Sequence, residues 1–228
     1  MVMGITLEKI AAIHPQLYHM AQFGSWPSIR DHGLLSTSAL LDLFSIDDRE
    51  RPTIEDERRG RTIEITDGNG AVAYIRDQRP MSDKKLASCL EDGLLPRDWY
   101  RILNRKVFFW LTKKRLETLM GAYSDEPHLV LEIDTEKLLS IHGHEVLLAP
   151  MNTGCTSPMA FPRGTNTFLR PEDYDFEGNR RKKGGPTKAI VELTVEYSVP
   201  DIAACTSRAS HQQIEKGELE LIEMLHEI

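Results

Sequence analysis

The sequence predicts a single α+β domain. Helical and strand-like segments follow one another without the regular alternation of a βαβ winding. Of the 228 residues, 40% are apolar, which is enough for a sizeable core. Two short alternating segments flank the run Asp67-Gly68-Asn69-Gly70, a turn sequence that favours an antiparallel hairpin because Asn and Gly accept positive φ.

The first part of the chain is expected to form short elements. They are a helix at 7–14, a strand at 16–21, helices at 26–32 and 38–44, an exposed charged loop at 46–61, and hairpin strands at 61–66 and 71–76. The helix at 26–32 has the clearest boundaries. Ser25 is a preferred N-cap, and Gly33 supplies a left-handed stop.

The remaining elements follow from the same signals. They are helices at 82–92 and 96–104, a strand at 106–111, a helix after Thr112, a strand at 128–134, a strand at 188–200, and two C-terminal helices at 201–208 and 210–228. Leu221, Ile222 and Leu225 give the last helix an apolar face. Residues 142–186 show little periodicity, so we expect one domain over 1–228 with a long irregular insertion there.

Composition excludes several classes of protein. The formal net charge of −7 argues against attraction of nucleic acid by the whole surface. Three widely spaced cysteines fit neither a disulfide framework nor a zinc site, and the pair His142 and His144 is too weak a pattern to predict a metal. No apolar run is long enough to span a bilayer. We therefore expect a soluble cytoplasmic protein without a metal, and composition does not indicate its oligomeric state.

The strand at 190–197 places two carboxylates on one face. Alternation directs Val191, Leu193, Val195 and Tyr197 to one side, and Ile190, Glu192, Thr194 and Glu196 to the other. The first side is the expected core. The second is more often a solvated face, and the alternative is a carboxylate that lines a cleft and binds a sugar hydroxyl or orients a nucleophile.

Three further features have both a structural and a functional interpretation. His19, in an apolar strand, is more often a satisfied core residue, but its ring could contact a ligand hydroxyl. Trp110 is most simply a core residue, although its ring could stack on a base. The basic run at 179–188 is usually a solvated loop. Beside an active site, its residues Arg180, Arg181, Lys182 and Lys183 would attract a phosphate-bearing substrate such as a nucleic acid.

Three segments together resemble DarT-like ADP-ribosyltransferases. They are LYHMAQFGSWPSIRDHGLLS at 17–36, VFFWLTKKRLETLM at 107–120 and AIVELTVEYSVPDI at 189–202. Most of the chain is also similar to bacterial proteins of the DUF7002 type, with RGTNTF and YSVPDIA as further marks. The resemblance implies an ADP-ribosyltransferase-like fold, in which two small antiparallel sheets form a cleft for NAD between flanking helices.

The resemblance also implies roles for residues on the cofactor side. His19 would contact the ribose hydroxyls of NAD, and Tyr18 precedes it in the same Tyr-His pair. Ser25 and Ser28 would lie near the adenosine or phosphate side. Trp110, at the end of the aromatic strand, completes the set of residues expected to bind NAD.

By the same resemblance, Glu192 would be the catalytic carboxylate. Its task would be to stabilise the positive charge that develops on the sugar when the nicotinamide–ribose bond breaks. Glu196 is its rival, because some related transferases place a polar residue two positions before the acid, as Thr194 is here. The characterised transferases have a Pro-Arg turn after the aromatic strand. Here Lys113 or Arg115 would take that place, and a lysine lacks the bidentate geometry of arginine.

These implications lead to three functional hypotheses. The first is an NAD-dependent mono-ADP-ribosyltransferase, with nucleic acid, or less probably a protein, as acceptor. The second is a module on the same fold that binds NAD, ADP-ribose or a nucleic-acid end without catalysis. The third and weakest is an enzyme similar to RNA 2′-phosphotransferases, since these share the scaffold.

Overall fold

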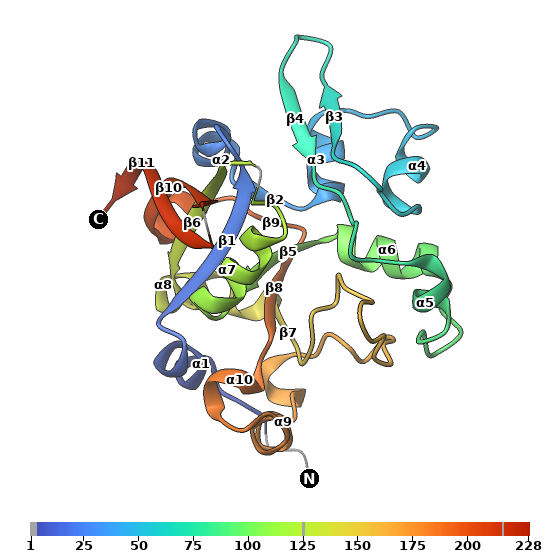
Figure 1. Ribbon diagram of the computed structural model, residues 1–228, viewed down its shortest axis with the longest axis vertical. Helices are drawn as coiled ribbons and strands as arrows, with labels where there is room; N and C mark the ends of the chain where they lie inside the picture. The colour runs from blue at the N-terminus through green and yellow to red at the C-terminus, as the bar shows by residue number, and fades with distance from the viewer. Residues whose placement is uncertain (1–3, 125, 216) are drawn as a thin grey trace.

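The centre of the protein is a seven-stranded antiparallel sheet, seen in a computed structural model that describes residues 4–124, 126–215 and 217–228 (Figure 1). The strand order is β11-β10-β6-β1-β5-β8-β7. These strands are β1 (Gln16–Gln22), β5 (Lys106–Trp110), β6 (His128–Asp134), β7 (Val146–Ala149), β8 (Glu192–Glu196), β10 (Thr206–Glu215) and β11 (Glu218–Glu227). The α+β class is confirmed, but the main strands form one continuous sheet where two small sheets were expected.

Two small antiparallel pairs accompany the main sheet. They are β2 (Leu34–Leu35) with β9 (Ser198–Val199), and β3 (Ile63–Thr66) with β4 (Val72–Ile75). The second pair is the hairpin predicted from the Asp-Gly-Asn-Gly turn. It projects from one end of the molecule, above α3 (Figure 1).

Short helices surround the sheet. They are α1 (Leu7–Ile13), α2 (Trp26–His32), α3 (Thr37–Leu43), α4 (Arg51–Glu55), α5 (Asp83–Ala87), α6 (Pro96–Asn104), α7 (Lys113–Gly121), α8 (Thr135–His142), α9 (Phe176–Lys183), α10 (Pro186–Ala189) and α11 (Ile202–Cys205), with 3₁₀ turns at Gly143–Glu145 and Pro171–Asp173. Gly33 ends α2 as predicted, with φ +84°. A Cβ at this position would lie 2.5 Å from the Cα of Pro200, so only glycine fits where the two segments meet.

Both faces of the sheet are covered. One face packs on the main core, in which Leu17, Phe109 and Leu193 are fully buried together with residues of α8. On the opposite face, α7 places Leu116 against residues of β1 and β6, and α6 places Trp99 against β7. A strand of such a sheet is buried on both sides, and β8 is the clearest case.

The sheet opens between β1 and β5. β1 pairs with β6 along its whole length, whereas its register with β5 has one pair, Tyr18 with Trp110. Beyond that pair the two strands separate. The residues of β1 after Tyr18 and of β5 before Trp110 therefore border a space that a regular ladder would have closed.

The C-terminal prediction was wrong. Helices were expected at 201–208 and 210–228, but only α11 is helical and the rest forms the β10–β11 hairpin. β10 pairs with β6 over most of its length, and Leu219 packs beside α7. Pairing with a neighbouring strand thus overrides the helical spacing of the apolar residues, which is a local signal only.

Two predicted irregular segments are also more ordered than expected. The stretch 142–186 contains the edge strand β7 and the helix α9, so the irregular part is confined to about 150–170. The charged segment 46–61 contains α4. Its Arg59 is buried and donates hydrogen bonds to the carbonyls of Ile54 and Arg76, which is how this arginine is accommodated without exposure.

Candidate functional site

A cavity of about 430 Å³ opens where β1 and β5 separate. Its walls come from the end of β1, from α2 and α3, from the β3–β4 hairpin and from the start of β5. The polar side chains that line it are provided by His19, Ser25, Ser28, His32, Arg76 and Lys106, among others. We call it the His19 pocket. Its volume is within the range of ordinary small-molecule sites.

His19 has one ring nitrogen committed and one available. Its Nδ1 lies 2.8 Å from the carbonyl oxygen of Phe108 on β5. A carbonyl can only accept, so Nδ1 must carry the proton and Nε2 is an acceptor. Burial lowers the pKa of His19 to about 4, and the nearby charge of Arg76 contributes in the same direction. The ring is therefore neutral at physiological pH, with Nε2 able to accept a hydrogen bond from a ligand hydroxyl.

The charged side chains that line the His19 pocket are all of one sign. Arg76 and Lys106 are cationic, and none of the residues that line the pocket in the described part of the chain is a carboxylate. Large apolar side chains at its rim are unusually exposed: Phe23, Leu43, Val72 and Tyr74 are each between 43% and 48% accessible. The pocket thus combines an apolar rim with positive charge, which favours an anionic ligand that has an aromatic or apolar part.

Glu196 is connected to this lining by an ion pair with Lys106. Its carboxylate is 2.6 Å from Nζ of Lys106 and 3.2 Å from Nε of Arg105, and about a third of its side chain is exposed. Lys106 lines the pocket, and Glu196 is the acidic group that forms a direct ion pair with this lysine.

The residue after Glu196 has a strained backbone. Tyr197 has φ +64°, a conformation that is rare for a bulky residue. Its amide donates to the carbonyl of Arg105 at 2.6 Å, and its hydroxyl donates to Asp42 of α3. These bonds tie the end of β8 to both β5 and α3, and so fix the backbone that positions Glu196.

Glu192, at the other end of β8, is enclosed. Only 3% of it is exposed, and it accepts hydrogen bonds from Thr153, from the amide at 3.2 Å and from Oγ1 at 2.7 Å. Burial raises the pKa of Glu192 to about 7, while the bonds from Thr153 and the charges of Arg115 and Arg163 oppose this shift. The prediction of a solvated face was wrong here, because the loop at 150–163 covers the start of β8.

Arg163 holds that covering loop in place. It is 1% exposed, and its guanidinium donates to the carbonyls of Thr153, Cys155 and Phe161. The indole of Trp99 also donates to the carbonyl of Thr153. With its oxygens engaged by Thr153, Glu192 acts in this structure as an anchor for the loop.

The predicted site residues are divided between two places. His19, Ser25 and Ser28 line the His19 pocket, but Tyr18, Trp110 and Glu192 do not. By register, these last three lie side by side in one row across β1, β5 and β8, and neighbouring residues of one row share a face of the sheet. His19, the next residue along β1, points to the opposite face. The expectation that His19 and Glu192 border one cavity is therefore not met.

The predicted cationic residues lie with Glu192. Lys113 and Arg115 are in the first turn of α7, outside the His19 pocket. Lys113 is exposed, whereas Arg115 is half-buried and close enough to Glu192 to oppose the rise in its pKa. Neither replaces the family's arginine at the His19 pocket, where Arg76 and Lys106 are the cations.

The basic run is the end of a helix. Arg180, Arg181, Lys182 and Lys183 form the last turn of α9, at the opposite end of the molecule from α3 and the β3–β4 hairpin (Figure 1). Lys183 donates to the carbonyl of Pro150, and burial together with the charge of Arg115 lowers its pKa to about 8. This run therefore belongs to the Glu192 end, and it is helical where a loop was expected.

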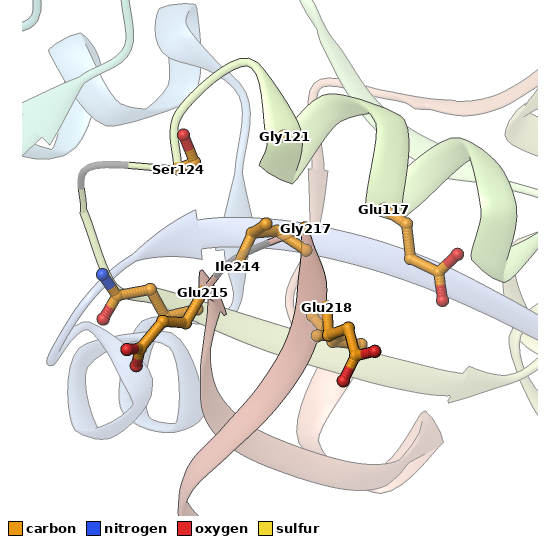
Figure 2. Close-up of a pocket in the computed structure, with 9 residues that line it drawn as sticks. Glu117, Gly121, Ser124, Ile214, Glu215, Gly217 and Glu218 are labelled. Carbon is orange, nitrogen blue, oxygen red and sulfur yellow. The ribbon is translucent and has the colours of Figure 1, made fainter.

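A larger hollow of about 980 Å³ has the opposite charge. It lies between the end of α7 and the β10–β11 turn, and Figure 2 shows the carboxylates of Glu117, Glu215 and Glu218 at its edge. An anionic ligand would be repelled there. None of the predicted site residues lines this hollow.

The described residues form neither a metal-binding cluster nor a membrane-spanning helix. Within 4–124, 126–215 and 217–228, no three His, Cys, Asp or Glu side chains come together as metal ligands. Over those ranges, no helix has the length and apolar character to cross a bilayer.

Sequence analysis missed Arg76 and Lys106. Arg76 ends the strand-like segment AVAYIR, and Lys106 begins the strand-like segment KVFFWL. Neither segment differs from an ordinary strand, so the local sequence does not identify these two residues as part of a site. Arg76 comes to the His19 pocket at the end of a hairpin that packs against α3 and α4, whereas Lys106 comes to it at the start of β5. Only the tertiary arrangement brings them near His19.

A family model matches most of the chain. A sequence profile described as "Family of unknown function (DUF7002)" matches residues 15–206. This range includes every residue that lines the His19 pocket and both glutamates of β8. No curated protein matches the chain.

Proposed function

The chain belongs to the DUF7002 family, and we propose that it is an NAD-dependent mono-ADP-ribosyltransferase that binds NAD in the His19 pocket. One observation supports this best. His19, Ser25 and Ser28, which the resemblance to DarT-like enzymes assigns to NAD, line a single cavity that holds two cations and no carboxylate among its described lining.

The chemistry of the pocket suits the parts of NAD. The pyrophosphate is anionic, and Arg76 and Lys106 offer it positive charge. The exposed rings of Phe23 and Tyr74 offer a base a stacking surface. The free Nε2 of His19 can accept from a ribose hydroxyl, as the resemblance implies.

Glu196 is the acid that this proposal assigns to the reaction. The bond between nicotinamide and the ribose C1′ breaks, and nicotinamide leaves as a neutral molecule with the bonding electron pair. An ionised carboxylate stabilises the positive charge that develops on the ribose. The acceptor then bonds to C1′ and gives its proton to the carboxylate. A phosphate that competes for Lys106 would release Glu196 to turn toward the sugar.

Labelled NAD tests the proposal. Wild-type protein is incubated with it and with a mixture of nucleic-acid and protein acceptors, beside Glu196→Gln and the matched variant Glu192→Gln. Glu196→Gln is expected to lose about a thousandfold in transfer, and Glu192→Gln to stay near the wild-type rate. Circular dichroism checks that both variants fold. Absence of both transfer and NAD breakdown in the wild type would refute the proposal, and loss in Glu192→Gln alone would refute Glu196 as the acid.

A specific observation favours a second function. The lining of the His19 pocket contributes no carboxylate within the described residues, and Glu196 is neutralised by Lys106 and Arg105. A pocket with this lining is sufficient for a module that binds NAD or ADP-ribose without catalysis. Calorimetry that shows saturable binding of NAD, with nicotinamide release no faster than in buffer, would support it over the transferase.

A further inference from the structure

Arg76 is a cation with an unused donor in a binding cavity. It directly follows β4 and lines the His19 pocket. Its Nη1 is buried and has no hydrogen-bond partner among the described residues. A buried N–H group without a partner costs stability, so such a donor calls for an acceptor that the folded chain itself does not provide.

The guanidinium of Arg76 is held in a fixed orientation. Nη2 lies 3.3 Å from Nδ1 of His128, and the guanidinium lies over the ring of Tyr123 at 4.4 Å. Nε2 of His128 is 2.9 Å from the carbonyl of Tyr123 and must donate to it, so Nδ1 is the acceptor for Arg76. The backbone is fixed as well, because the carbonyl of Arg76 accepts from Nε of Arg59 at 2.9 Å.

The charge of Arg76 has no carboxylate in contact with it in the described structure. The acid next in sequence, Asp77, is already used: it pairs with Arg79 at 3.2 Å and accepts from the hydroxyl of Tyr123 at 2.8 Å. Desolvation lowers the pKa of Arg76, and the nearby charges of Asp77 and Glu126 oppose this shift. A pre-oriented cation that lines a cavity, with no carboxylate in contact with it among the described residues, is an arrangement suited to bind an anion.

We infer that the guanidinium of Arg76 binds a phosphate group of the ligand in the His19 pocket. A planar guanidinium suits two phosphate oxygens, and Arg76 is one of the two cations that line this pocket. The identification of the ligand as NAD depends on the proposed function, whereas the preference for phosphate does not.

Arg79 provides a matched control. It is an arginine three residues away whose guanidinium lies over the same Tyr123 ring, at 4.7 Å. It differs in being exposed, ion-paired with Asp77 and absent from the pocket lining. Arg76→Gln and Arg79→Gln therefore remove the same type of charge from the two sides of one aromatic ring.

Calorimetric titration of the full chain with ADP-ribose, NAD, inorganic pyrophosphate and adenosine tests the inference. Arg76→Gln should weaken binding of the three phosphate-bearing molecules at least about tenfold and leave adenosine within about twofold. Arg79→Gln should bind all four as the wild type does. The melting temperatures of unliganded Arg76→Gln and Arg79→Gln check that a loss of binding does not come from unfolding.

The outcomes separate this inference from the proposed function. Binding of pyrophosphate and ADP-ribose that depends on Arg76, without binding of NAD, upholds the phosphate site and refutes the proposed cofactor. Equal binding of NAD by wild type and Arg76→Gln overturns the inference and leaves the proposed function intact. A wild-type protein that binds none of the phosphate-bearing molecules, or an equal loss in Arg79→Gln, overturns the inference.

Discussion

The two ends of β8 place the same residue in opposite environments. Glu192 and Glu196 lie four positions apart on one face of one strand, and the sequence pattern treats them alike. Glu192 is sealed beneath the 150–163 loop, where Thr153 occupies its oxygens. Glu196 is partly exposed and forms ion pairs with Arg105 and with Lys106, the second of which lines the His19 pocket. What covers a strand, and not its alternation, decides whether a carboxylate is structural or available for chemistry.

The surroundings extend this contrast. At the Glu192 end, the buried polar groups satisfy one another, as Arg163 does through three backbone carbonyls. At the Glu196 end, Nη1 of Arg76 has no hydrogen-bond partner among the described residues, and Tyr197 has a strained backbone. Strain and unsatisfied groups are often concentrated where a protein binds or reacts. We therefore expect substitutions to affect stability at the first end and ligand binding at the second.

The largest expected effect is on stability. Glu192→Ala leaves the donors of Thr153 unpaired and the buried charge of Arg163 less compensated, so it should lower the free energy of unfolding by about 3 to 5 kcal/mol. Glu196→Ala breaks a partly exposed ion pair and should cost less than about 1 kcal/mol. Urea unfolding of both variants measures the difference. Equal losses would remove the distinction between the two ends.

Glu192 should make a pH-dependent contribution to stability of its own, opposite in sign to that of His19, whose pKa is lowered. Its pKa in the folded protein is about 7, above the ordinary 4.5 that applies to the unfolded chain. Between these values the folded state holds a proton that the unfolded state has lost, so stability from this group is complete below pH 4.5 and falls as pH rises to about 7. The loss is no more than about 3 kcal/mol. Glu192→Gln should remove this loss, so that the slope of unfolding free energy against pH between 4.5 and about 7 becomes more positive than in the wild type, and an unchanged slope would contradict the assignment.

A smaller effect is expected at His19. In His19→Asn the amide can still donate to the carbonyl of Phe108, but the acceptor at Nε2 is lost. The dissociation constant for NAD should rise about tenfold, as for one lost hydrogen bond. Tyr18→Phe, on the opposite face of β1, should leave it unchanged. Fluorescence or calorimetric titration compares them, and similar affinities in His19→Asn and wild type would exclude contact with the sugar.

The early elements could be predicted because their signals are local. Gly33 marks the end of α2, Pro96 the start of α6, and the Asp-Gly-Asn-Gly run the β3–β4 hairpin. Such residues fix the backbone through their own allowed dihedrals. The same locality allowed three pocket residues, all within 19–28, to be selected from one short segment.

The rest depends on contacts between distant segments. The β10–β11 hairpin was expected to be helical, because the spacing of its apolar residues does not reveal that β6 offers a free edge. The burial of Glu192 depends on a loop that begins forty residues earlier, held by Arg163. Arg76 reaches the pocket because the β3–β4 hairpin packs against α3 and α4, where Ile75 shares a core with Leu41 and Ile54. None of these contacts leaves a periodic trace in the sequence.

Hydrogen–deuterium exchange with saturating NAD tests the central claim most directly, because it reports where on the molecule the ligand binds. We predict slower exchange of backbone amides at 23–36 and 72–76, which border the His19 pocket, and no change at 150–163 around Glu192. Protection confined to 150–163 and the start of α7, with none at the pocket, would contradict the account.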